Sequence, residues 1–399
     1  MCMNAEWCIK EKARLRKINI TLYIEAPLYF PVETWPTFEW VFLLFNINKF
    51  VYYVYMRILI INPVDWPFDE NSINSGIGGS ETWVIQLSEA FARKGIETIV
   101  LCNCETHLSQ LGVWYLNYHE LNNVLSQQKF ELIIISRKYL NLLSGIDYYK
   151  TSDNVFIQAH DVEIYGDDIN KIKVLPCFKG ISTLSAYQER NIYVKCGVDW
   201  KYMVRIGNGI DTRLFENLDY TPTNKRLLFS SDYARGGYIM KDFVVPKLLS
   251  LGVDTGSDFC SYTPCDIEQN EYAQLFGCMP KETLYKEMSN RYCWFYPGVF
   301  NETFCITMIE NIMCGNDIIA PLTYGLSSVI EPFVNDVSMK HRFDKSEDEF
   351  WMAVDEASNR INESFCNYKK GEELRKELKN YILSNYTWDI IADKWLKLI

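Results

Sequence analysis

Short apolar runs alternate along most of the chain, from Met56 onward, with amphipathic stretches of helical length. A parallel β-sheet covered by helices on both faces has this pattern, because its strands are buried and its crossover helices expose one side. Two such blocks are predicted. The expected strands are Arg57–Asn62, Thr98–Cys102, Glu131–Ser136, Val155–Ala159 and Ile181–Leu184 in the first block, and Arg226–Ser230, Asp258–Tyr262, Cys293–Tyr296 and Asp317–Ala320 in the second.

The pattern also predicts helices and a division into domains. A helix is expected over Ser80–Lys94, stopped by Gly95, and the turn-rich segment Gly207–Asp211 is a candidate hinge. We therefore expect an α/β fold with two Rossmann-like domains, residues 56–205 and 206–375, facing each other across a cleft. Ligands of such sheets bind at the carboxyl ends of the strands, so the cleft is the predicted site.

Residues 1–55 fit neither a secretory signal nor the regular pattern that follows. The segment Trp40–Tyr55 is rich in aromatic residues but carries Lys49 in its middle, and a central lysine costs about 2.5–3.5 kcal/mol on membrane-insertion scales. We expect no stable membrane span. Met56 is the expected natural start, and residues 1–55 are interpreted as a leader or an upstream extension.

Charge and cysteine content limit the classes of partner and compartment. The chain has 399 residues, 48% of them hydrophobic, which excludes a disordered tail or a disulfide-stapled miniprotein. The net charge of −11 gives no general attraction for nucleic acid. Thirteen cysteines, an odd number without zinc-finger spacing, predict free thiols, no metal site and a cytoplasmic location, with peripheral contact with a membrane left open.

The first chemical signal is the glycine-rich sequence Gly76-Ile-Gly-Gly-Ser-Glu81 at the start of the first predicted helix. Free backbone amides and the helix dipole at such a position favour an anion, for which phosphate is the natural candidate. A purely structural turn stays open as an alternative. About a dozen residues, Pro63–Ser75, separate the strand from the glycines, so the segment is a poor dinucleotide-binding motif and is better suited to forming a wall of the cleft.

The most specific feature is a pair of glutamates, Glu302 and Glu310, eight positions apart across a predicted helix start. If Thr303 or Phe304 opens the helix, Glu302 stays in the loop and the two carboxylates are up to roughly 12 Å apart along the axis. One ligand with hydroxyl groups at both ends and a phosphate between them could touch both. The amides of the helix start would then face the phosphate, and these belong to Phe304, Cys305 and Ile306. A Glu302 that only interacts with the helix dipole and a solvated Glu310 stay open as an alternative.

Two further candidates follow predicted strands on the cleft side. Arg235 lies in the loop after the first strand of the second block, where a guanidinium is suited to a diphosphate. His160 ends a strand of the first block. An ordinary surface arginine and a structural histidine stay open as alternatives.

Together these motifs resemble the family four glycosyltransferases of GT-B fold, which move a sugar from a nucleotide donor. The resemblance runs from Met56 to Ile399. It rests on Ser80-Glu81, His160-Asp161, Asn208-Gly-Ile-Asp211 with Phe215, Arg235-Gly236, Glu302, Glu310 and a terminal helix containing Trp388. In such enzymes a last helix, here residues 376–399, crosses back to the first domain.

The resemblance implies roles for these residues. Gly78, Gly79 and Arg235 would bind the diphosphate, Glu310 the ribose hydroxyls and Glu302 the hydroxyls of the transferred sugar. His160 would lie beside the reacting sugar and would act in catalysis with Arg235 and Glu302. The remaining donor-binding candidates are Asn208, Thr303, Phe304, Cys305 and Ile306.

The chain departs from the family at one position. Many relatives have two cations five positions apart on the phosphate loop of the second domain, but here Ser230 precedes Arg235 by five. We expect Arg235 to carry the role alone, helped by Lys241.

The reaction implied is retaining, metal-independent transfer of a hexose or pentose. It needs no cofactor, and it passes the sugar from a UDP- or GDP-linked donor to a hydroxyl of a glycan, lipid-linked or protein-linked acceptor. Acceptor loops are expected on the first domain at Pro63–Ser75 and Tyr165–Asp168. A nucleotide-sugar-binding protein without transfer activity stays open, as does a sugar-nucleotide epimerase.

Overall fold

The structure is a computed structural model that describes residues 56–137, 151–164, 176–261 and 265–399. These residues belong to one unit, Tyr52–Ile399. The predicted leader of residues 1–55 and the predicted acceptor loop Tyr165–Asp168 lie outside the described residues. In the part of the chain that is described, no helix combines the length and the apolar character needed to span a bilayer.

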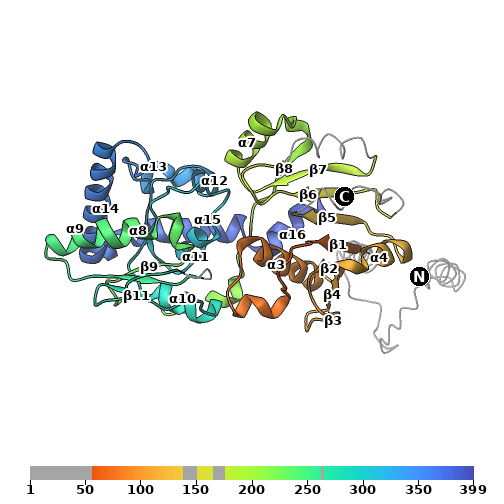
Figure 1. The fold of residues 1–399 in the computed structure, drawn as a ribbon, viewed down its shortest axis with the longest axis horizontal. Helices are drawn as coiled ribbons and strands as arrows, with labels where there is room; N and C mark the ends of the chain where they lie inside the picture. Colours follow the sequence, from red (N-terminus) through yellow and green to blue (C-terminus); the bar gives the residue numbers. More distant parts are fainter. Residues whose placement is uncertain (1–55, 138–150, 165–175, 262–264) are drawn as a thin grey trace, which may run out of the picture. The chain divides into compact units, whose positions relative to one another are not determined.

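The first half of the described chain is built on an eight-stranded sheet in the order β3-β4-β2-β1-β5-β6-β7-β8, in which only the β3–β4 pair is antiparallel (Figure 1). All five expected strands are present. Their neighbours β3, β4 and β8 were not predicted, because they are short or half exposed and lack a continuous apolar run. The strands are β1 (Arg57–Ile61), β2 (Glu97–Cys102), β3 (His107–Leu108), β4 (Val113–Asn117), β5 (Leu132–Ser136), β6 (Val155–Gln158), β7 (Phe178–Thr183) and β8 (Met203–Arg205).

The second half contains two smaller parallel sheets, ordered β11-β10-β9 and β12-β13. The four expected strands are again present, and the short β11 was not predicted. The strands are β9 (Leu227–Phe229), β10 (Ser257–Phe259), β11 (Ala273–Leu275), β12 (Cys293–Phe295) and β13 (Asp317–Ile319). The predicted α/β fold with two Rossmann-like halves is therefore confirmed.

Helices cover both faces of the first sheet, because alternate residues of its central strand are buried on opposite sides. Ile58 and Ile60 of β1 pack in one cluster with α3 and α16, whereas Leu59 and Ile61 pack in another with α4 and α7. The helices are α3 (Gly79–Arg93), α4 (Leu121–Gln127), α7 (Ala186–Cys196), α8 (Gly237–Ile239), α9 (Val245–Ser250), α10 (Lys281–Ser289), α11 (Ile306–Met313), α12 (Gly325–Val329), α13 (Val334–Val337), α14 (Glu347–Asn367), α15 (Glu372–Asn385) and α16 (Trp388–Leu396).

The chain passes between the halves twice, and the two passages lie side by side. The candidate hinge Gly207–Asp211 is the first passage, and its Ile210 exchanges backbone hydrogen bonds with Tyr386 and Trp388 of the second, at 2.7 and 3.3 Å. The predicted crossing helix 376–399 is two helices in the structure. The first, α15, packs on α11 in the second half, and only α16 packs on α3 in the first (Figure 1). The side chain of Thr387 accepts a hydrogen bond from the Ile390 amide and so begins α16 anew.

The helix behind the paired glutamates begins later than predicted. Instead of Thr303 or Phe304, Ile306 opens α11, after Cys305 in the left-handed conformation (φ 74°). Tertiary contacts hold the preceding residues outside the helix. The Glu302 carbonyl accepts a hydrogen bond from the Gly325 amide at 2.8 Å, and the Thr303 hydroxyl donates to the His160 carbonyl at 2.9 Å.

Candidate functional site

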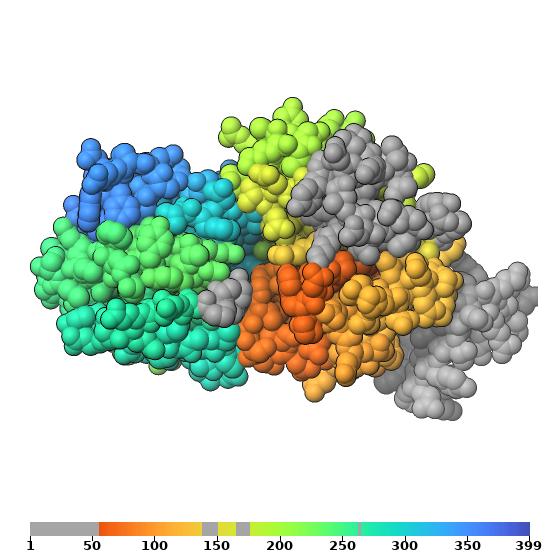
Figure 2. All heavy atoms as spheres, viewed as in Figure 1, coloured from red at the N-terminus to blue at the C-terminus, as the bar shows by residue number. Residues whose placement is uncertain are grey.

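A cavity of about 260 Å³ lies where the carboxyl ends of the strands of both halves meet. The space-filling view shows the surface hollowed where residues of the two halves come together (Figure 2). The first half contributes the glycine-rich segment and the residues after β5 and β6. The second half contributes the segments after β9 and β10, the start of α10 and the start of α11. The cleft predicted from the sequence is therefore present as a cavity.

Two helix N-termini meet in this cavity. A side-chain carbon added at Gly79, the first residue of α3, would lie 3.6 Å from Cδ1 of Ile306, the first residue of α11. The first amides of a helix have no partner inside it and carry partial positive charge. Gly79 and Ile306 line the cavity, but Gly78, the residue before α3, does not.

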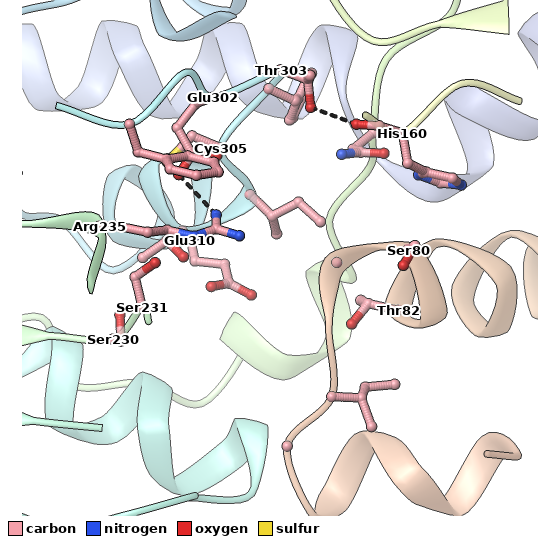
Figure 3. Close-up of a pocket in the computed structure, with 18 of the residues that line it drawn as sticks. Ser80, Thr82, His160, Ser230, Ser231, Arg235, Glu302, Thr303, Cys305 and Glu310 are labelled. Carbon is pink, nitrogen blue, oxygen red and sulfur yellow. Dashed lines mark hydrogen bonds and ion pairs between the residues drawn. The ribbon is translucent and has the colours of Figure 1, made fainter. Parts of the chain in front are cut away.

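Arg235 is held beside Glu302 (Figure 3). Its Nη1 donates to Oε1 of Glu302 at 2.9 Å, and the Tyr296 hydroxyl donates to the same oxygen at 2.7 Å. The guanidinium also lies over the ring of Phe300, 4.3 Å from its centroid. Gly236 turns the chain after Arg235 with φ 113°, a conformation that favours glycine. Glu302 itself is buried, and burial raises the pKa of Tyr296 well above its usual value.

Glu310, which lies inside α11, has a similar set of partners. Its Oε1 accepts hydrogen bonds from the Lys281 ammonium and, at 2.8 Å, from the Tyr285 hydroxyl. The Tyr285 ring stacks on Phe215 with centroids 4.5 Å apart, which fixes the phenol. Each buried glutamate of the second half therefore has one cation and one tyrosine hydroxyl as partners.

His160 lies on the opposite side of the cavity, at the end of β6. Its Nε2 is 2.9 Å from the Ser136 hydroxyl, and its ring meets Trp83 edge-on at 5.3 Å between centroids. Burial, together with the nearby charge of Arg137, lowers the pKa of His160 to about 3. The imidazole is therefore neutral near pH 7. Figure 3 shows its carbonyl bonded to Thr303, a link between the two halves.

Other predicted residues differ in how close they come to this site. Asn208 lines the cavity, is 5% exposed, and its Oδ1 has no hydrogen-bond partner among the described residues. Thr303, Phe304 and Cys305 also line it. Lys241 does not line the cavity and pairs with Asp242 at 2.6 Å. The structure thus does not bring Lys241 to Arg235, because Lys241 lies in the helical segment that follows the loop.

Two cations of the cavity were missed by sequence reasoning. Lys281 opens α10, and nothing in its neighbourhood in the sequence links it to Glu310, which follows 29 residues later. Arg137 follows the last residue of β5. A polar residue at the carboxyl end of a predicted strand is the signal that singled out His160, and the same signal would have found Arg137.

One group of side chains in the described residues has the composition of a metal site, but it lies elsewhere. Single ligand atoms of Asp69, Glu70 and His107 lie within 4.8 Å of one another, and none of these residues lines the cavity. His107 Nε2 is 2.7 Å from Glu70, and this contact raises the pKa of the histidine. An ion pair accounts for the arrangement.

Comparison with known proteins gives matches in structure only. No protein-family model and no curated protein matches the sequence. A glycosyltransferase of Rickettsia africae superposes with a TM-score of 0.63 at 12% identity, over 86% of this chain and 97% of its own. HepE of Anabaena, in complex with UDP and glucose, superposes with a TM-score of 0.61 at 13% identity, over 86% of this chain and 99% of its own. The sucrose-phosphate synthase of Thermosynechococcus elongatus gives 0.57 at 14% identity over 86% and 98%.

These matches cover 86% of this chain and nearly the whole of the similar structures, but their sequence identities are low. They therefore bear on the fold. The similar structures are glycosyltransferases with two Rossmann-like domains, the architecture found here in the two halves around the cavity. The chain has the GT-B fold that the sequence motifs predicted.

Proposed function

We propose that the chain is a retaining glycosyltransferase, which moves a sugar from a UDP- or GDP-linked donor to a hydroxyl of a glycan, lipid-linked or protein-linked acceptor. One observation carries the proposal. Two buried glutamates, each paired with a cation, lie beside the N-terminus of α11 in a single cavity. A nucleotide sugar has hydroxyl groups at both ends and a diphosphate between them. The hydroxyl groups suit the two glutamates, and the diphosphate suits the helix N-terminus between them. HepE, of the same fold, was also solved with UDP-glucose bound.

In this proposal the second half binds the donor. The diphosphate lies at Arg235 and at the N-termini of α3 and α11, where the charge and the free amides favour an anion. Glu310 accepts hydrogen bonds from the ribose hydroxyls, and Glu302 from those of the transferred sugar. Lys281 then supplies the second cation that Ser230 does not, because it lines the same cavity.

The chemistry is a transfer on one face of the sugar. The bond from the anomeric carbon to the departing phosphate oxygen breaks, and the acceptor oxygen attacks from the same side while its proton passes to that phosphate oxygen. Negative charge grows on the diphosphate, and groups that stabilise it more in the transition state accelerate the step. We propose that Arg235, Lys281 and the helix N-termini do this without a metal ion. Neutral His160 lies beside the sugar, with its Nε2 engaged by Ser136.

The compartment is part of the proposal. All cysteines of the described residues are free thiols, which supports a reducing, cytoplasmic environment.

A donor screen tests the function. UDP- and GDP-sugars are added to the protein and its melting temperature is measured, then nucleotide release and sugar-tagged acceptors are analysed by mass spectrometry. A glycosyltransferase shows stabilisation by one donor, release of its nucleotide and a product carrying the sugar. Stabilisation without nucleotide release would favour a sugar-nucleotide-binding protein. This alternative is suggested by Ser230, which stands where many relatives have a second cation. No stabilisation by any donor would contradict both.

A further inference from the structure

Arg137 is the cation that the proposed donor site does not use. It directly follows β5, at the same edge of the sheet at which His160 follows β6, and it lines the cavity from the first half. Its backbone has φ 55°, in the left-handed region that residues other than glycine rarely adopt. Strain of this kind persists where the surrounding structure holds it, and it is concentrated at functional sites.

The three cations with which the described residues line the cavity differ in how they are paired. Arg235 donates to Glu302 at 2.9 Å, and Lys281 contacts Glu310 directly. The carboxylate closest to Arg137 in the described residues is that of Asp161, at 4.0 Å, and 64% of the Asp161 side chain is exposed to solvent. The Nε of Arg137 is buried and has no hydrogen-bond partner among the residues that the structure describes. Arg137 thus keeps hydrogen-bonding capacity that its neighbours do not use.

Within the described part of the chain, no second carboxylate pairs with Arg137. Besides Asp161, the titratable group at this edge in the described residues is His160, which is neutral and whose Nε2 is occupied by the Ser136 hydroxyl. A buried donor without a partner is unfavourable unless a ligand satisfies it. A guanidinium presents several N–H groups in a planar fork that matches the two oxygens of a carboxylate or phosphate.

We propose that Arg137 binds a carboxylate or phosphate group of the substrate, on the side of the cavity next to His160. This inference rests on the proposed function and specifies its substrate class: either the transferred sugar or the acceptor is anionic. The two sources present the same chemistry to Arg137, so the experiment separates them.

Binding measured by calorimetry tests the inference with the wild-type protein, Arg137→Gln, Arg137→Lys and Arg190→Gln. The last is a matched control, because Arg190 is an exposed arginine of the same half and does not line the cavity. In the donor arm, UDP-glucuronic acid is compared with UDP-glucose. In the acceptor arm, protein saturated with UDP is titrated with inorganic phosphate.

The expected result is an anion preference of about tenfold or more in one arm, the size of a charge-assisted hydrogen bond. In the donor arm the preference is tighter binding of UDP-glucuronic acid than of UDP-glucose. In the acceptor arm it is tighter binding of phosphate to the wild-type protein than to Arg137→Gln. Arg137→Gln abolishes this preference, Arg137→Lys keeps part of it, and Arg190→Gln leaves it intact. A preference in the donor arm assigns the anion to the sugar, and phosphate binding to the UDP complex assigns it to the acceptor.

Two outcomes overturn the inference, and both are distinct from failure of the proposed function. One is the absence of an anion preference in both arms, and the other is a preference that Arg137→Gln leaves unchanged. In either case the proposed function survives if UDP still binds the wild-type protein and the Arg137 variants with equal affinity. If neither UDP, GDP nor their sugar conjugates bind the wild-type protein, the proposed donor site fails first.

Discussion

The cavity residues of the first half and those of the second half, called here the first and second walls, differ in how their charged groups are paired. On the second-half wall, Glu302 and Glu310 each accept hydrogen bonds from a cation and a tyrosine hydroxyl. On the first-half wall, a neutral histidine lies beside an arginine whose Nε has no partner in the described residues. The second wall thus holds its charges in place before any ligand arrives, which is what preorganised stabilisation of a transition state requires. The first-half wall leaves hydrogen-bonding capacity of Arg137 open for binding a ligand.

The largest effect is expected from breaking the second wall at Arg235. Arg235→Ala removes the guanidinium proposed to stabilise the departing diphosphate, and loss of one such donor costs on the order of 10²–10³ in kcat. Turnover of the donor found in the screen measures it. Lys241→Ala is the matched control, because it removes a cation that follows the same loop outside the cavity.

Stability has to be measured beside activity for this variant. Arg235→Ala leaves buried Glu302 with Tyr296 as its one remaining partner of the two described here, so some loss of unfolding free energy is expected. A folded Arg235→Ala protein with undiminished turnover would remove Arg235 from the mechanism.

A smaller effect is expected at Glu310. Glu310→Gln weakens the acceptor proposed for the ribose hydroxyls and releases Lys281, and a hydrogen bond to a charged group is worth about 1.5–3 kcal/mol. We expect KM for the donor to rise by roughly tenfold or more, with kcat less affected, because ribose is bound alike in the ground and transition states. Steady-state kinetics over a range of donor concentrations measures this.

Glu282→Gln is the control for Glu310. Glu282 pairs with Lys286 on α10, the helix that carries Lys281, and its side chain is 70% exposed. An exposed pair of this kind contributes little, so the kinetics of this variant should match the wild type. A fall in kcat at Glu310→Gln with KM unchanged would argue against ribose as the partner of Glu310.

The sequence predicted the framework of both walls well. The buried strands are continuous apolar runs, and β1 is the clearest case, since four of its five residues are fully buried. The polar residues that end such strands or open the next helix are then brought to one edge by the topology alone. This is why His160 and Arg235 could be picked out from the sequence, whereas Glu302 and Glu310 were picked out by their spacing across a predicted helix start.

What could not be predicted depends on contacts between distant segments. The start of α11 is delayed by two tertiary hydrogen bonds. The Gly325 amide donates to the Glu302 carbonyl, and the Thr303 hydroxyl donates to the His160 carbonyl. Neither Gly325 nor His160 is near these residues in the sequence. Lys281 finds Glu310 through the packing of α10 on α11. Local patterns carry no information about such pairings. Lys241, which was expected to help Arg235, instead pairs with its neighbour Asp242 and does not line the cavity.

The smallest effect concerns the first wall and its neutral histidine. The pKa of His160 is lowered to about 3, against about 6.5 for a histidine in an unfolded chain. Between these values the unfolded chain takes up a proton that the folded protein does not, so stability falls as the pH falls below about 6.5. From pH 7 to pH 5.5 we expect His160 to account for a loss of about 1 kcal/mol of unfolding free energy.

Urea unfolding at both pH values measures this loss, as the difference between the wild type and His160→Gln. Other groups titrate in the same range, but they do so in both proteins and cancel in the difference. His119→Gln, at an exposed histidine of the same half, should keep the full dependence of the wild type. If His160→Gln lost as much stability between the two pH values as the wild type does, the imidazole would titrate normally. The first wall would then be charged below pH 6.5, and His160 would compete with Arg137 for the same anion.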